Sequence, residues 1–445
     1  MELAIKIFQF ILSISILVIL HELGHFLPAK WFKTKVEKFY LFFDPYFSLV
    51  KKKIGDTEYG IGWLPFGGYV KIAGMVDESM DTEQLKKPAE PWEFRSKPAW
   101  QRLIIMLGGV TVNFFLAWLI YGCLSFFNGE TSFDTAKVNA PMNYTEVAKG
   151  MGFQDGDKIL KVDGKTQNNL DKLALDVLLS DEITVLRNGK EITFPTSDDG
   201  KAMAFKDENP RAFLTPRFSA VVDSIYNPKT LAAGLKVGDQ ITSVNGKKID
   251  YYDQFQEAVR NNAGKDIQVE VSRAGSVQPL TLNVSKEGTL GLVSYKQMRN
   301  YYETKTFTFA QSIGRGFTRS IESLTYQVKQ FKLIFNRKVQ GYKKVGGPLA
   351  IINNMPVDKA TDGSVSVDWT AFWSFTAMFS VWLAFLNLIP IPGLDGGHVI
   401  FTLYEMIVGK PVPQKVLENA QMVGVIFLLG LMLLIFGNDI VKLFL

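Results

Sequence analysis

Residues that bind metals through sulfur or imidazole are scarce in this chain of 445 residues. There is one cysteine, Cys123, so the chain cannot form an internal disulfide or a zinc site built from several thiolates. There are three histidines, His21, His25 and His398. Any metal site must therefore take its ligands from these histidines and from carboxylates.

Long runs of one charge are also missing. The 49 basic residues nearly balance the 44 acidic ones, and the formal net charge is +5. No basic run with interleaved aromatic residues marks a nucleic-acid surface, so nucleic acid is not an expected partner. The hydrophobic content of 47% is high for a purely soluble protein and indicates membrane segments combined with soluble modules.

Four apolar runs are long enough to cross a bilayer as helices, at residues 3–27, 103–127, 371–391 and 422–445. Residues 28–53, after the first run, carry seven lysines against two acidic residues. Because an excess of lysine marks the cytoplasmic side of a membrane protein, this loop is expected in the cytoplasm. Residues 128–370 then face outward, and the loop after the third run returns to the cytoplasmic side.

The first apolar run contains the sequence His21-Glu22-Leu23-Gly24-His25. In a helix, histidines four residues apart share one face and can bind one tetrahedral metal ion, with Glu22 beside them. Ionisable residues within a membrane helix are costly unless they are paired or metal-bound. The setting therefore favours a zinc-hydrolase site over a buried polar cluster without metal.

A third ligand is expected near the end of the third apolar run, which reads Leu-Asn-Leu-Ile-Pro-Ile-Pro-Gly-Leu-Asp-Gly-Gly-His over residues 386–398. Its prolines and glycines break the helix at membrane depth and can aim Asp395 inward. His398 is the rival candidate. Asp395 is preferred, because a carboxylate often completes a catalytic site with two histidines and leaves a position for water.

Residues 59–72 lie in the lysine-rich loop and combine β-forming residues with glycine and proline. The pattern predicts two short strands around a Pro-Gly-Gly turn. Such a hairpin could enter the membrane only where protein or a water-filled cavity provides hydrogen-bond partners for its backbone N–H and C=O groups. Its free edge could bind an extended peptide by strand addition. An ordinary surface hairpin is the alternative.

The outward segment contains an internal repeat. Residues 152–159 recur as residues 234–241, and the turn signals Asp163-Gly164 and Asn245-Gly246 keep the same spacing. Two copies of one small β-rich domain are therefore expected. After them, residues 309–335 have the pattern of an amphipathic helix, which could lie on a membrane surface or pack as a solvated helix.

Taken in order, these motifs resemble the site-2 protease family of intramembrane zinc proteases, and within it the bacterial regulator-of-sigma-E proteases. The resemblance covers essentially the whole chain. It implies that His21, His25 and Asp395 bind Zn²⁺ and that Glu22 acts as the general base. It further implies that Asn387 and Asn113 handle the substrate. One departure from the family pattern lies near Asn113, because Val110 stands where the family often has proline.

The resemblance also implies an architecture. The fold class is an α-helical polytopic membrane protein with four transmembrane helices, a re-entrant β-hairpin and two inserted β-rich PDZ-like domains. The hairpin would bind substrate through Gly62, Trp63 and Leu64. The expected divisions are 1–127 for the first two helices and the hairpin, 128–210 and 211–296 for the PDZ-like domains, 297–370 for an amphipathic helix and connector, and 371–445 for the last two helices.

The expected function is zinc-dependent cleavage of single-span proteins in the lipid bilayer of the bacterial inner membrane, as part of regulated intramembrane proteolysis. The resemblance implies pre-trimmed anti-sigma factors and remnant signal peptides as substrates. Two alternatives remain, a membrane-embedded zinc hydrolase of another class and an inactive PDZ scaffold. The PDZ-like domains could bind peptide termini or exclude bulky substrates.

Overall fold

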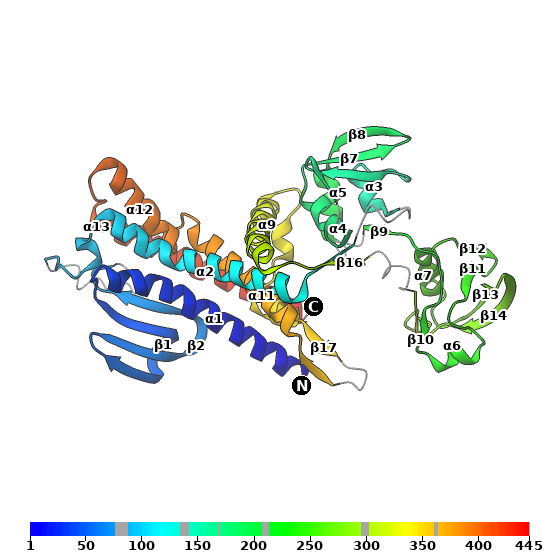
Figure 1. Cartoon of the computed structure of the whole chain (residues 1–445), viewed down its shortest axis with the longest axis horizontal. Helices are drawn as coiled ribbons and strands as arrows, with labels where there is room; N and C mark the ends of the chain where they lie inside the picture. The colour runs from blue at the N-terminus through cyan, green and yellow to red at the C-terminus, as the bar shows by residue number, and fades with distance from the viewer. Residues whose placement is uncertain are drawn as a thin grey trace. The chain divides into compact units, whose positions relative to one another are not determined.

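The computed structural model describes residues 1–75, 88–133, 142–167, 170–206, 213–294, 302–359 and 364–444. The chain forms two compact units (Figure 1). The first, here called the helical unit, comprises Met1–Gly129, Thr306–Phe331 and Lys344–Leu445. The second, the β-rich unit, comprises Glu130–Lys305 and Lys332–Lys343.

Four helices of the helical unit are long and apolar enough to cross a membrane: α1 (Glu2–Trp31), α2 (Ala99–Asn128), α11 (Trp369–Leu388) and α13 (Gln414–Phe444). They correspond to the four predicted apolar runs. The prediction of a membrane protein with inserted β-rich parts is therefore confirmed at this level.

The helix bounds differ from the predicted runs at several ends. Helix α1 continues past Pro28 to Trp31, and α2 begins four residues before its apolar run, at Ala99. Helix α11 ends at Leu388 and not at residue 391, because Ile389 precedes Pro390 and adopts an extended backbone with φ −62° and ψ 137°. Helix α13 begins at Gln414, eight residues before the apolar run, since polar residues form its first two turns. Between the two lies α12 (Asp395–Val408), whose first residue is Asp395.

Helix α2 packs against α1, α11 and α12. Glycines allow the closest of these contacts: a Cβ atom on Gly24 of α1 would lie 2.6 Å from the carbonyl carbon of Gly108 and 2.8 Å from the Cα of Gly109. Small residues at such crossings let two helix backbones approach closely. The segment of α1 from His21 to His25 therefore lies directly against α2.

The loop after α1 forms a β-hairpin of β1 (Val36–Ile54) and β2 (Thr57–Ile72), which lies alongside α1 (Figure 1). The predicted strands around a Pro-Gly-Gly turn were wrong in detail. The turn is at residues 55–56, and residues 59–72 all belong to β2. Residues 38–41 of β1 pair both with residues 68–71 and with residues 58–61 of β2, and residues 58–61 also pair with residues 50–53 of β1. Between these two parts of β1 the chain bends at Phe42 and Tyr46, which have φ of 67° and 74°.

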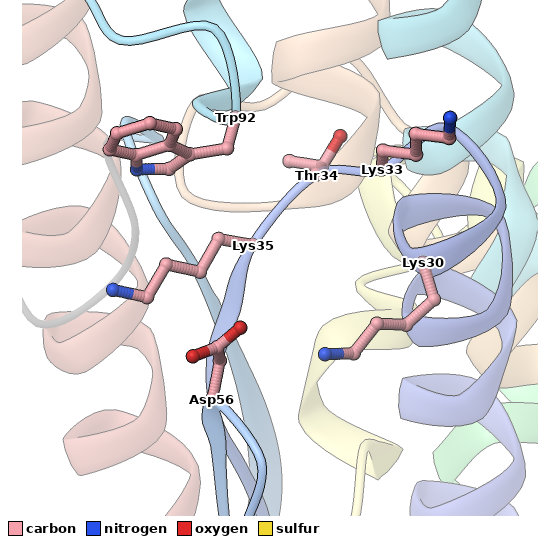
Figure 2. Close-up of a pocket in the computed structure, with 6 residues that line it drawn as sticks. All are labelled: Lys30, Lys33, Thr34, Lys35, Asp56 and Trp92. Atoms are coloured by element: carbon pink, nitrogen blue, oxygen red, sulfur yellow. The ribbon is translucent and has the colours of Figure 1, made fainter.

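A hollow of about 480 Å³ lies where α1 ends and β1 begins (Figure 2). It is lined by Lys30, Lys33, Thr34, Lys35, Asp56 and Trp92. Three lysines and one aspartate are therefore among the residues that line it, at the C-terminal end of the first membrane helix. These three lysines belong to the seven in residues 28–53 on which the predicted membrane orientation depends.

The remaining elements of the helical unit connect the long helices. They are η2 (Phe94–Ser96), most of α9 (Phe309–Phe335), α10 (Pro348–Asn353), β17 (Val357–Lys359) and β18 (Val365–Val367).

Asp439 of α13 is 3% exposed and accepts hydrogen bonds from the backbone N–H groups of Gly347 and Leu349, at 2.8 and 3.1 Å. Asp439, an acidic residue within the last apolar run, thus caps α10 with its carboxylate.

Helix α9 spans the predicted range and packs on α2. The Trp118 indole donates a hydrogen bond to the carbonyl of Ile313 at 2.8 Å, and a Cβ atom on Gly316 would lie 2.7 Å from the Cα of Gly122. Phe317 packs edge-to-face on Trp118, whereas Ile321 and Val328 remain exposed. Within the helical unit α9 therefore packs on α2 and leaves other apolar side chains exposed.

The β-rich unit contains two sheets with the same strand order. The first is β6-β5-β7-β8, and the second is β12-β11-β13-β14. Asp163 and Asn245 both have positive φ, 48° and 49°, and the glycine after each is also left-handed, as the predicted hairpin turns require. The sheet strands are β5 (Lys158–Val162), β6 (Lys165–Thr166), β7 (Glu182–Arg187), β8 (Lys190–Pro195), β11 (Gln240–Val244), β12 (Lys247–Lys248), β13 (Asp266–Arg273) and β14 (Ser276–Asn283).

The same buried ion pair stabilises each copy. Arg187 meets Asp157 at 2.7 Å, and Arg273 meets Asp239 at 2.6 Å. Burial of Asp239 disfavours its charge, yet Arg273 and the backbone N–H of Lys236 hold its pKa below the usual value.

The other elements of this unit are β3 (Glu130–Phe133), β4 (Met142–Tyr144), α3 (Glu146–Gly150), α4 (Leu170–Leu179), α5 (Asp198–Lys206), β9 (Leu214–Pro216), β10 (Ser224–Ile225), α6 (Pro228–Ala232), α7 (Tyr252–Arg260), β15 (Leu292–Val293), β16 (Tyr302–Lys305) and η3 (Gly341–Lys344).

Candidate metal centre

Helix α1 presents His21 and His25 on its buried face, at 8% and 5% exposure. Their spacing of four residues puts both rings on the side that faces α2. The Nδ1 atom of His25 lies 2.8 Å from the carbonyl oxygen of Ile105. Because that carbonyl can only accept a hydrogen bond, Nδ1 carries the proton, and the lone pair of Nε2 points into the site.

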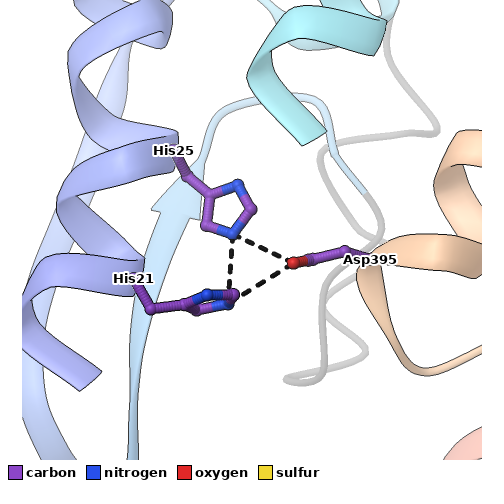
Figure 3. Close-up of side chains that lie close together, drawn as sticks. All are labelled: His21, His25 and Asp395. Carbon is purple, nitrogen blue, oxygen red and sulfur yellow. Dashed lines mark hydrogen bonds and ion pairs between the residues drawn. The ribbon is translucent and has the colours of Figure 1, made fainter. Parts of the chain in front are cut away.

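Asp395 reaches the same place from the first turn of α12. Its Oδ2 atom lies 3.4 Å from Nε2 of His21 and 3.2 Å from Nε2 of His25, and the two Nε2 atoms are 3.3 Å apart (Figure 3). The break at residues 389–394 makes this possible, because it ends α11 and begins a new helix at the aspartate.

The triangle of ligand atoms fits zinc. Ligands at about 2.0–2.1 Å around a tetrahedral ion lie about 3.3 Å from one another, which is the spacing of these three atoms. Oδ2 of Asp395 is buried without a hydrogen-bond donor among the described residues. All three atoms can act as acceptors, and a cation between them would offset the cost of burying them together.

Glu22 lies next to the triangle and is not part of it. Among the described residues, the group able to hold a metal consists of His21, His25 and Asp395. The Glu22 carboxylate instead accepts a hydrogen bond from the backbone N–H of Val70, and a Cβ atom on Gly68 would lie 3.6 Å from its Cγ. Strand β2 therefore reaches α1 beside the residue expected to transfer protons.

His398 stands three residues after Asp395 on α12 and is not in the metal-binding group of the described residues. Its backbone carbonyl accepts the hydroxyl of Thr402 at 2.8 Å. The structure thus brings together the preferred set of ligands and not the set with the rival histidine.

The two asparagines both contact His21, but through different ring nitrogens. Nδ2 of Asn387 lies 3.2 Å from Nε2, the atom that faces Asp395. Nδ2 of Asn113 lies 3.1 Å from Nδ1, on the other side of the ring. The resemblance gave both residues one role, whereas their positions relative to the ligand triangle differ.

The residues predicted to hold substrate lie on β2. Gly62 pairs with Ser48, Leu64 pairs with Phe43, and the Trp63 indole donates a hydrogen bond to the Pro45 carbonyl at 3.0 Å. They therefore belong to the middle of the hairpin, whereas the part of β2 that contacts Glu22 is at Gly68 and Val70.

Sequence reasoning missed Gly109 of α2. A Cβ atom there would lie 2.6 Å from Cε1 of His21 and would also overlap Nε2 of His25. Only a residue without a side chain leaves room for both rings. The signal was available in the Gly108-Gly109 pair within an apolar helix, since small residues there mark a close helix contact.

Comparison with known proteins agrees with this geometry. A family model, that of peptidase family M50, matches residues 9–431. The chain belongs to peptidase family M50. It is thus a membrane metalloprotease, and the predicted family and enzyme class are confirmed.

Two relatives show the extent of the similarity. The regulator of sigma-E protease RseP of Escherichia coli is 29% identical, with 98% of each chain covered. A protein of Vibrio cholerae with the provisional name of a zinc metalloprotease is 27% identical, again with 98% of each chain covered. Similarity therefore extends through the helical and the β-rich unit alike.

Gly109→Ala tests the packing of the site. The added methyl group must push the imidazoles apart, at a cost of about 1–3 kcal/mol for overpacking. We expect zinc affinity to fall about 10- to 100-fold, measured by competition with a chelator on the purified protein. Gly430→Ala is the matched control, because a Cβ atom there has open space. Equal zinc affinity of the two variants would show that the rings do not depend on Gly109.

Proposed function

We propose that this metalloprotease is an intramembrane endopeptidase that cleaves single-span membrane proteins. His21, His25 and Asp395 hold one Zn²⁺, and Glu22 is the catalytic acid and base. The observation that carries the proposal is the triangle of ligand atoms, 3.2–3.4 Å apart, that membrane helix α1 forms with the break after α11. Ionisable groups are retained at such depth only where they are paired or functional.

The chemistry divides between metal and protein. When bound, zinc supplies a Lewis acid that makes water a nucleophile and polarises a carbonyl. Glu22 accepts a proton from the attacking water and delivers it to the amine that leaves. The backbone N–H of Val70 orients this carboxylate, because it donates a hydrogen bond to it.

A transmembrane substrate must unwind before cleavage, because a helix hides its carbonyl groups in its own hydrogen bonds. Strand addition to the β1–β2 hairpin, at Gly62, Trp63 and Leu64, replaces some of the lost bonds. Asn387 contacts the metal side of His21 and is therefore placed to hold the opened backbone.

We assign the end of α1 to the cytoplasmic side of the bacterial inner membrane, on the basis of the lysine-lined hollow. The hairpin is then a re-entrant element, and the β-rich unit is extracytoplasmic. Its two similar sheets form PDZ-like domains that exclude substrates with bulky outer parts. Cleavage of long and trimmed forms of one substrate distinguishes this exclusion from the binding of peptide termini.

The names of the relatives suggest a physiological setting. RseP of Escherichia coli is named a regulator of sigma-E protease. By analogy, trimmed anti-sigma factors and remnant signal peptides are the substrates proposed for this protein, within regulated intramembrane proteolysis. An inactive scaffold is disfavoured, because the ligand triangle and Glu22 are all present.

Glu22→Gln tests the proposed mechanism. The amide keeps the size of the side chain but cannot accept the proton, so cleavage of a trimmed single-span substrate should fall by at least about 10²-fold. Zinc content should stay at the wild-type level, because Glu22 is not a ligand. Normal turnover by a variant with full zinc would remove Glu22 from the mechanism.

The role of the hairpin in substrate binding is tested by comparing cleavage by the Leu64→Pro and Leu64→Ala variants. Proline removes a backbone N–H that could bond to an added strand, whereas alanine keeps it. We expect proline to reduce cleavage more than alanine while both variants retain zinc. If the two substitutions have equal effects on cleavage, Leu64 takes no part in strand addition.

A further inference from the structure

Asn113 is the buried polar residue whose contacts the proposed mechanism leaves unexplained. Its side chain is 0% exposed, and its amide nitrogen lies 3.1 Å from Nδ1 of His21. Its Oδ1 atom is buried and has no hydrogen-bond partner among the described residues. A buried amide oxygen without a donor is costly, so this arrangement needs an explanation.

The chemistry of a metal-binding histidine supplies one. A neutral imidazole that binds metal through Nε2 carries its proton on Nδ1, and that proton needs an acceptor. For His25 the acceptor is the carbonyl oxygen of Ile105, at 2.8 Å. For His21 the group beside Nδ1 is the Asn113 amide.

The amide can provide that acceptor. A half-turn about its last side-chain bond exchanges the nitrogen and oxygen atoms with almost no change in shape. The carbonyl oxygen then accepts the Nδ1–H of His21, and the oxygen that lacked a donor gains one. A single rotation therefore gives the Nδ1–H of His21 an acceptor and the amide oxygen a donor, and moves Nδ2 to the position that the oxygen held.

The backbone at Asn113 is also fixed. The hydroxyl of Ser380, on α11, donates a hydrogen bond to the Asn113 carbonyl at 2.7 Å. One turn earlier on α2, Gly109 leaves space for both imidazole rings. The same face of α2 thus gives the rings room and offers a bonding partner to one of them.

We propose that Asn113 is a positioning residue for the metal ligand His21 and not a substrate-binding residue. Its side-chain carbonyl accepts the Nδ1–H of His21, which fixes the tautomer and ring orientation that leave Nε2 for zinc. Asn387, on the Nε2 side, keeps the role of contacting substrate. The inference rests on the proposed ligand set and separates two asparagines that the family resemblance treats alike.

The test compares zinc affinity among variants of the full-length protein in detergent, by competition with a chelator. Asn113→Leu keeps the approximate size but removes the acceptor, and Asn113→Asp restores an acceptor. Asn387→Leu is the matched control on the other side of the ring. We expect Asn113→Leu to weaken zinc binding about 10- to 100-fold, and Asn113→Asp and Asn387→Leu to stay within a few-fold of wild type.

Cleavage of a trimmed substrate at saturating zinc is the second measurement. Asn387→Leu should lose cleavage with zinc affinity intact, and Asn113→Leu should regain most of its cleavage as zinc is raised. Wild-type zinc affinity in Asn113→Leu would overturn the inference, as would equal weakening by Asn113→Asp and Asn113→Leu. Failure of the wild-type protein to bind zinc would instead contradict the proposed function, so the two failures are distinguishable.

Discussion

Close contact between α1 and α2 is the constraint on which the site depends. The two histidines project from α1 toward a helix whose backbone lies too near for any side chain at Gly108 or Gly109. In a bilayer, where lipid is as apolar as leucine, such contacts depend on packing and on hydrogen bonds between helices. The same approach brings the Ile105 carbonyl and the Asn113 amide to the outer nitrogens of the rings.

The third ligand depends on a second constraint, the broken helix. Pro390 and Pro392 prevent α11 from continuing, and α12 then starts at Asp395 with its carboxylate directed at both Nε2 atoms. Non-helical backbone at membrane depth is tolerated where protein or a cavity satisfies its polar groups. One such group is the N–H of Gly393, which donates a hydrogen bond to the side chain of Gln421 at 3.2 Å. Helix α13 thus supports the segment that delivers Asp395.

Much of this arrangement is predictable from the sequence, because it follows from local patterns. The spacing of His21 and His25, the proline break before Asp395 and the apolar runs all depend on residues near one another in the chain, and the repeat is visible as a recurring sequence. The hairpin was mispredicted, because residues 59–72 belong to one strand whose partner is β1 and not to two strands around a turn. Positive φ at Phe42 and Tyr46 bends β1 without a glycine to signal it. Residue type alone could not separate Asn113 from Asn387, because their difference lies in which side of one imidazole each contacts.

The central claim is that Asp395, and not His398, completes a zinc site with the two histidines of α1. Zinc content of the purified Asp395→Ala and His398→Ala proteins tests it most directly. Loss of Asp395 should strip or greatly weaken zinc, because only two protein ligands remain. His398→Ala should retain one zinc ion per chain, because this residue lies outside the ligand triangle. Stoichiometric zinc in Asp395→Ala together with its loss in His398→Ala would contradict the account.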